Sequence, residues 1–387
     1  MNIHILIVFL LVLISGTPTI RQYQYYEYLP LLLSILTSFI YRTNVISFLR
    51  SSSIYFISVI LIFIFQYLTF DFISLLGSIN LLVKIYLAGL IYYAQKDTFR
   101  KNFFYVMYFF SLVSIIVFPY TMLTNSAPDF MGMEQFKSIG IYNQKVLFNG
   151  SFLPRNSGPF WEPGAFAGYL LLCIALYIND INYLWKTQKF KFIIVIAAFI
   201  TTFSTTGYLT LFICIIIKMI LSAKTNISTY IALLFFTISS FIIYTQFDFL
   251  GEKINSQINE TQKYNQEFSN KRMGAFIFDL HYIEKHPLTG NGWHARTRWA
   301  DHPILQNQEL SGETLGHGNG FSNFLASMGC LFVLFYFYLI YRNLSFSPID
   351  KIVFIVFLII ILQGEQYLLY PIFLGLPLYR TVYNQAL

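Results

Sequence analysis

Charged residues are scarce in this chain. Only 11% of its 387 residues are Asp, Glu, Lys or Arg, whereas soluble domains carry about 25%, and this difference excludes an ordinary soluble enzyme. Cysteine is also rare: Cys173, Cys214 and Cys330 all fall in apolar runs, so we expect no disulfide framework. The 25 basic residues are spread through the loops and form no basic face, which argues against a nucleic acid partner.

The chain is rich in apolar residues. It is 56% hydrophobic and 19% aromatic, with a mean hydropathy of +0.59, which excludes a disordered protein. A spanning helix needs about 20 apolar residues, so we predict an all-α polytopic membrane protein. Residues 1–387 are expected to form a single transmembrane domain of about twelve helices. The apolar windows are 3–19, 28–41, 54–70, 76–94, 103–123, 163–183, 190–204, 206–221, 228–246, 321–341, 351–363 and 366–380.

Basic residues predict the orientation of these helices. With both termini cytoplasmic, the inner loops hold thirteen of the 25 basic residues, and the short outer loops hold only Arg21. Two long outer loops, 124–162 and 246–320, then carry most of the polar chemistry. The second also contains five of the six histidines. Long loops packed on a bundle are common places for functional sites, so we expect the site there.

The end of the first outer loop carries one candidate constellation. Arg155 precedes the sequence Phe-Trp-Glu-Pro-Gly at 160–164. Glu162 stands directly before a proline, as at the first turn of a helix, where the helix dipole favours a carboxylate. Gly164 and Gly168 allow this helix to approach a neighbour closely. Arg155 is placed to reach either an anionic headgroup or Glu162. The structural alternative is that Glu162 caps the helix and Arg155 is an interfacial anchor.

The second outer loop carries further candidates. Arg272 begins a stretch with helical apolar spacing, which predicts an amphipathic helix on the bundle. A cation at a helix start opposes the helix dipole and is tolerable if an anion lies nearby. The turn-rich sequence Pro-Leu-Thr-Gly-Asn-Gly at 287–292 leads to Arg296 and Arg298. Either each arginine binds an anion or it is simply solvated.

Titratable groups near the outer mouth of the bundle are candidate bases. His317 lies between glycines in Gly-His-Gly-Asn-Gly at 316–320, which also contains Asn319, and a histidine can accept a proton near neutral pH. Glu365 lies between the last two windows, and an acid at membrane depth is a functional candidate. The histidine spacings fit no metal site, and no Walker A, dinucleotide or nucleophile-elbow motif occurs. We therefore expect no metal and no cofactor.

Taken together, these motifs resemble the O-antigen polymerase (Wzy) and O-antigen ligase superfamily. The resemblance rests on Arg155 before 160–164, on Arg272 about fifteen residues before 287–292, on His317 and Asn319 with Gly329 beyond them, and on the span layout. The resemblance covers about residues 140–340. The start of the predicted eighth span lacks the Ser-Arg of many members, and Gly318 separates His317 from Asn319.

The resemblance implies a GT-C-like membrane fold with a large helical periplasmic loop. It also implies metal-independent glycosyl transfer on the periplasmic face of the bacterial inner membrane. Donor and acceptor would be glycans linked to undecaprenyl diphosphate. Arginines (Arg155, Arg272, Arg296, Arg298), with Asn319, would hold the diphosphate, and a loop base would activate the acceptor hydroxyl. Of the catalytic candidates His317, Glu162 and Glu365, His317 leads, because its glycine neighbours allow close approach, its ordinary pKa fits periplasmic pH and it lies near the position of the family's histidine.

Several functional alternatives stay open at this point. The Glu-Pro-Gly sequence favours a polymerase over a ligase that transfers to lipid A–core. A polysaccharide transporter or flippase with a glycan-binding loop, and a membrane scaffold, are the other classes. Membrane lipids are expected partners, and a chain-length regulator and a flippase are candidate protein partners.

Overall fold

The computed structural model describes residues 2–21, 25–124, 136–138, 142–145, 155–222, 272–293, 297 and 319–380. The secondary structure of these residues is helical apart from one antiparallel hairpin, formed by β1 (Phe136–Ser138) and β2 (Asn143–Lys145), and turns and loops connect the helices. Within the described residues, four helices are long and apolar enough to cross a membrane: Arg42–Phe70, Leu75–Gln95, Thr98–Leu123 and Gly320–Asn343. The predicted helical membrane class is therefore confirmed, and the count of twelve spans stays a prediction.

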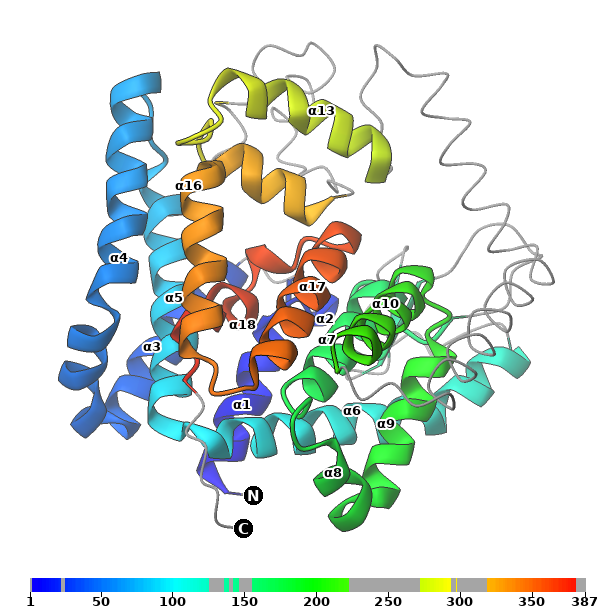
Figure 1. Cartoon of the computed structure of the whole chain (residues 1–387). Helices are drawn as coiled ribbons and strands as arrows, with labels where there is room; N and C mark the ends of the chain where they lie inside the picture. The colour runs from blue at the N-terminus through cyan, green and yellow to red at the C-terminus, as the bar shows by residue number, and fades with distance from the viewer. Residues whose placement is uncertain are drawn as a thin grey trace.

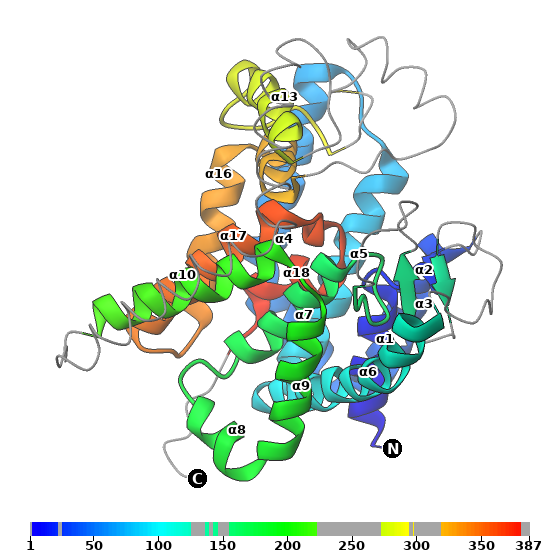
Figure 2. The same ribbon diagram turned by 90° about the vertical axis from the view of Figure 1, so that its right-hand side faces the viewer.

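The helices differ in length and pack together in one bundle (Figures 1 and 2). Most predicted windows coincide with a helix, and the window 228–246 lies outside the described residues. The helices are α1 (Ile3–Ile14), α2 (Pro18–Arg21), α3 (Leu29–Ile40), α4 (Arg42–Phe70), α5 (Leu75–Gln95), α6 (Asp97–Thr124), α7 (Pro163–Ala175), α8 (Ile181–Thr187), α9 (Lys189–Thr201), α10 (Thr205–Leu221), α13 (Arg272–Lys285), α16 (Gly320–Asn343) and α17 (Pro348–Gly364).

The last apolar window, 366–380, is not the single spanning helix that its hydropathy predicts. It forms two 3₁₀ turns, η2 (Tyr367–Leu369) and η3 (Leu376–Leu378), and one helical turn, α18 (Pro371–Leu374). Pro371 and Pro377 each lack the N–H group that a continuing helix needs. The segment is apolar because it is buried among other helices, so its hydropathy reports burial in protein rather than a membrane crossing.

Side chains from the surrounding helices satisfy the carbonyl groups of this broken segment. The hydroxyl groups of Tyr92, Tyr336 and Tyr55 donate to Ile372 O (2.7 Å), Phe373 O (2.6 Å) and Leu374 O (3.1 Å). Lys84 Nζ donates to Leu369 O at 3.0 Å. Non-helical backbone at membrane depth needs such partners, because no water is present to replace them. The charge of Lys84 inside a predicted span therefore has a structural use.

The turn-rich sequence 287–292 locks α13 onto α16. Helix α16 is kinked at Gly329, which has a φ of 77° (Figure 1). Across the kink, Asn291 N donates to Ala326 O at 2.8 Å and Cys330 N donates to Pro287 O at 2.8 Å. The loop backbone thus takes up the bonds that the kink leaves open, and it carries α13 across the end of α16.

Two glycines make this lock possible. Gly290 and Gly329 both have positive φ, of 71° and 77°. A Cβ atom at Gly290 would collide with the backbone oxygen of Ser327, and one at Gly329 would collide with that of Leu288. Only glycine combines a left-handed backbone with so close an approach.

We expect Gly290→Ala and Gly329→Ala each to lower the stability of the protein by at least about 1–3 kcal/mol, the usual cost of one strained backbone position. The measurement is thermal unfolding of the detergent-purified chain. Gly77→Ala is the matched control, because Gly77 has no positive φ and its nearest obstacle is the Ser74 hydroxyl at 3.1 Å. Melting temperatures of Gly290→Ala and Gly329→Ala equal to that of the parent would show that the contact between 287–292 and α16 does not depend on these glycines.

Candidate active site

The candidate site lies where the starts of α7, α10 and α13 meet the end of α17. Glycines allow these ends to approach one another. A Cβ atom at Gly364 would meet Thr206 Cγ2 at 2.8 Å, and one at Gly164 would meet Glu365 Oε1 at 2.8 Å. Figure 2 shows α7, α10 and α17 grouped beneath α13 and α16. Sequence positions more than 200 residues apart, such as 162 and 365, are therefore neighbours.

Glu162 stands at the start of α7, as predicted, but its carboxyl group does not cap that helix. Its backbone is extended, with a φ of −147°, and its side chain makes no capping hydrogen bond. Instead, the carboxyl groups of Glu162 and Glu365 are hydrogen-bonded to each other. The interpretation of Glu162 as a simple helix cap is therefore wrong. A hydrogen bond between two carboxyl groups requires that they share a proton.

Glu365 is the buried member of this pair, with 9% of its surface exposed. Trp161 Nε1 donates to its Oε2 atom at 3.0 Å, and Arg272 Nη2 lies 3.4 Å from its Oε1 atom. Burial, followed by the charge of Glu162, raises the pKa of the Glu365 carboxyl above its usual value. Arg272 and Trp161 act in the opposite direction but do not cancel this effect.

Arg272 enters the site as the first residue of α13. Its guanidinium donates to the Thr206 hydroxyl at the start of α10 and to Glu365. A helix therefore begins at Arg272, as predicted, and an anion lies near its first residue. The Glu365 carboxyl offsets the unfavourable position of a cation at a helix start. The predicted apolar face is wrong, because Phe276, Ile277 and Leu280 are exposed, whereas the buried residues of this helix include Ala275, Asp279 and Tyr282.

Arg155 approaches the cluster from the segment before α7. Its Nε atom donates to Thr202 O at 3.2 Å. Burial lowers the pKa of Arg155, while the charges of Glu162 and Glu365 favour its cationic form. The electrostatic neighbours of Arg155 also include Arg272. Two guanidinium groups thus face two carboxyl groups, and one proton shared by the pair leaves a net charge of +1, which favours an anion.

Asn319 packs beside the cluster but has a structural use. Its Oδ1 atom accepts a hydrogen bond from Ser322 N at 3.0 Å and so caps α16. A Cβ atom at the adjacent Gly320 would collide with Glu365 O, so the start of α16 touches the backbone of Glu365. His317, Arg296 and Arg298 lie outside the described residues, and their predicted roles stay predictions.

Sequence reasoning missed three side chains that build the site. Trp161 holds Glu365, Thr206 holds Arg272, and the Tyr367 hydroxyl donates to Gly164 O at 2.8 Å. Trp161 lies inside the motif at 160–164, so its position could have been noticed. Thr206 and Tyr367 carry no such signal, because a hydroxyl in an apolar run becomes informative only when its partner is known.

The described residues contain no group of three or more His, Cys, Asp or Glu side chains that could hold a metal ion. The chemistry that this cluster can perform follows from its own groups. Two guanidinium forks can bind phosphate oxygens in pairs. A carboxyl pair that shares one proton can both accept and return a proton.

We expect the shared proton to make stability depend on pH. A carboxyl group with a raised pKa binds more protons in the folded state, so stability is highest below the ordinary glutamate pKa of 4.5 and falls as pH rises above it. Melting temperatures of the detergent-purified protein across this range would show the fall. Glu365→Gln should flatten it, whereas Glu284→Gln, at an exposed residue of α13, should not. An identical slope in parent and Glu365→Gln would contradict the shared proton.

Comparisons of the sequence with protein-family models and with curated proteins find no match to this chain. The function is therefore inferred from its own residues.

Proposed function

We propose that this chain is a membrane glycosyltransferase that joins oligosaccharide repeat units carried on undecaprenyl diphosphate. Its product would be an O-antigen or capsule-type polysaccharide, made on the periplasmic face of the bacterial inner membrane. The observation that carries the proposal is the convergence of Arg155, Glu162, Arg272 and Glu365 from three segments: the stretch before α7, the start of α13 and the end of α17.

The arginines suit the diphosphate of such a donor. Breaking the bond between a sugar and a diphosphate releases a multiply charged leaving group. Guanidinium forks stabilise phosphate oxygens through two parallel hydrogen bonds, and they do so best where little water is present. Arg272 already reaches a carboxyl oxygen at 3.4 Å, and a phosphate oxygen can replace that partner. Two arginines can neutralise the diphosphate without a metal, so we propose metal-independent transfer.

The carboxyl pair suits the acceptor. A sugar hydroxyl of the acceptor attacks the anomeric carbon of the donor, and its proton passes to the carboxylate of the Glu162–Glu365 pair. The new bond joins the acceptor oxygen to the anomeric carbon, while the bond from that carbon to the diphosphate oxygen breaks. Undecaprenyl diphosphate then leaves as the anion held by the arginines. The proton on the pair is returned to solvent.

We propose the carboxyl pair rather than His317 as the base. The pair lies within reach of Arg272 and is held in place by Trp161, so base and phosphate-binding groups already belong to one cluster. His317, two residues before the Asn319 cap, remains the alternative.

The surroundings favour a membrane-bound substrate. The outward faces of the long helices are apolar, with more than 40% of the surface exposed at such residues as Ile54, Ile57, Leu61, Phe65 and Leu68 of α4. Exposed apolar surface of this extent is typical of contact with lipid. A ligase acting on lipid A–core would use the same donor chemistry, and a flippase would move the donor without forming a bond. Polymer growth by the purified protein separates these classes.

We expect Arg155→Ala and Arg272→Ala each to reduce polymer formation from a lipid-linked repeat unit at least about tenfold, because a charged hydrogen bond contributes about 1.5–3 kcal/mol. Lysine at either position should restore only part of the activity, since a point charge does not reproduce the fork. Gel ladders from purified protein are the measurement. Arg342→Ala, at an exposed residue over Tyr338, is the control. Parent-like ladders from both alanine variants would exclude diphosphate binding by these residues.

We expect Glu365→Gln to lower the rate of transfer by about 10² to 10⁴, the usual contribution of a general base, while donor binding is retained. His317→Ala should stay within about threefold of the parent. The measurement is single-turnover transfer alongside donor binding across a range of pH. If His317→Ala shows the large loss and Glu365→Gln does not, His317 is the base and the carboxyl pair has another role.

A further inference from the structure

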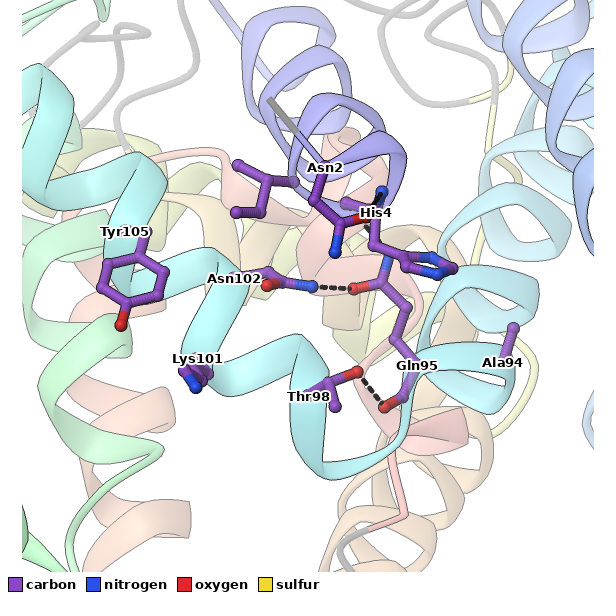
Figure 3. A pocket seen from close by; sticks show the side chains of 9 residues that line it. Asn2, His4, Ala94, Gln95, Thr98, Lys101, Asn102 and Tyr105 are labelled. Atoms are coloured by element: carbon purple, nitrogen blue, oxygen red, sulfur yellow. Dashed lines mark hydrogen bonds between the residues drawn. The ribbon is translucent and has the colours of Figure 1, made fainter.

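A second polar feature lies at the far end of α1 from the carboxyl pair. A cavity of about 420 Å³ opens between the first turn of α1, the end of α5 and the first turns of α6 (Figure 3). Its size is within the usual range for small-ligand sites. The described residues that line it include Asn2, His4, Thr98, Lys101, Asn102 and Tyr105, and none of them is acidic.

The floor of this cavity is a buried hydrogen-bond network. Asn102 Nδ2 donates to Gln95 Oε1 at 2.9 Å (Figure 3). Gln95 Nε2 donates to His4 O at 3.1 Å and to the Tyr41 hydroxyl at 2.8 Å. The Tyr41 hydroxyl is also hydrogen-bonded to His4 Nδ1, at 2.8 Å. Gln95 and Asn102 are only 4% and 8% exposed. The network therefore fixes which atoms the floor presents.

Those atoms are hydrogen-bond acceptors. Asn102 uses its amide nitrogen on Gln95, so it offers its Oδ1 atom, which has no donor among the described residues. The Thr98 hydroxyl donates to Gln95 O at 2.6 Å, and its lone pairs stay available. A ligand that carries hydroxyl groups can donate to both of these acceptors.

The rim of the cavity is cationic. Lys101 is exposed at the rim, and Lys191 lies 4.4 Å from the ring centroid of Tyr105, which lines the cavity. The starts of α1 and α6 add positive helix-dipole ends. The cavity thus combines an anion-binding rim with a floor that accepts hydrogen bonds.

We propose that this cavity binds the phosphoglycerol headgroup of an anionic lipid. Lys101 takes the phosphate, and the glycerol hydroxyls donate to Asn102 Oδ1 and Thr98 Oγ1. A phosphoethanolamine headgroup fits less well, because none of the lining residues that the structure describes carries a carboxylate for its ammonium group. Exposed apolar residues beside the cavity, Ile3 on α1 and Phe109 one turn beyond Tyr105 on α6, suit the acyl chains.

This site is separate from the carboxyl pair. Helix α1 has 12 residues, and at about 1.5 Å per residue it separates the cavity from Ser15 and Gly16 by roughly 18 Å. At that other end, Ser15 O accepts from the Tyr169 hydroxyl, and a Cβ atom at Gly16 would collide with Trp161. Headgroup binding therefore stands or fails independently of the proposed transfer reaction.

Lipid binding to the purified full chain in neutral detergent tests the proposal. Dioleoylphosphatidylglycerol is titrated against dioleoylphosphatidylethanolamine, with lipid retention read by native mass spectrometry. We expect the phosphatidylglycerol lipid to be retained preferentially. Lys101→Met should weaken its binding about tenfold or more, as the loss of one charged contact predicts, whereas Lys101→Arg should keep it. Lys186→Met, at an exposed lysine on α8, is the matched control.

A second variant reports on the floor of the cavity. Thr98→Val removes an exposed hydroxyl and should reduce the preference for phosphatidylglycerol over phosphatidic acid, which lacks the glycerol hydroxyls. Equal retention of the ethanolamine lipid, or equal weakening by Lys101→Met and Lys186→Met, would overturn the proposal. Displacement of the lipid by millimolar inorganic phosphate or glycerol phosphate would show a soluble-phosphate site instead.

Discussion

Every buried backbone N–H and C=O group in a membrane protein must find a partner inside the protein, since no water is available to replace one. This constraint explains the most irregular part of the chain. The segment after α17 is broken into short turns, and its free carbonyls are bonded by Tyr55, Tyr92, Tyr336 and Lys84 from three other helices. The same irregular backbone begins at Glu365, so the candidate site depends on the polar side chains that hold the break together.

Charge at the site follows a similar rule. A buried carboxylate is unfavourable unless it is protonated, hydrogen-bonded or paired, and Glu365 has all three remedies: Glu162, Trp161 and Arg272. Trp161 and Glu162 are neighbours at the start of α7, whereas Arg272 comes from the start of α13. The lock formed by Gly290 and Gly329 matters to the site for this reason, because it holds α13, and with it Arg272, above the bundle. Motif 287–292 therefore supports the cluster from a distance rather than touching it.

The two polar features of the structure differ in character. In the first, the carboxyl groups and the arginines are paired with one another, and a phosphate can replace a carboxyl group as the partner of an arginine. The cavity at the start of α1 has a rigid floor that offers acceptors and a cationic rim. Helix α1 touches both features, one at each end. Both suit phosphate chemistry at a membrane, and each can be tested without the other.

The sequence by itself determined the helical membrane class, most helix positions and the candidate residues Arg155, Glu162, Arg272 and Glu365. Apolar runs and proline or glycine positions are local signals, and charges in an apolar chain are few enough to be conspicuous. Only the tertiary structure decided that 366–380 is not a spanning helix, because hydropathy does not distinguish burial in lipid from burial in protein. Only it turned Glu162 from a helix cap into the partner of Glu365 and identified Thr206 as a partner of Arg272. Contacts between residues 66 and 203 positions apart depend on packing, which local sequence patterns do not encode.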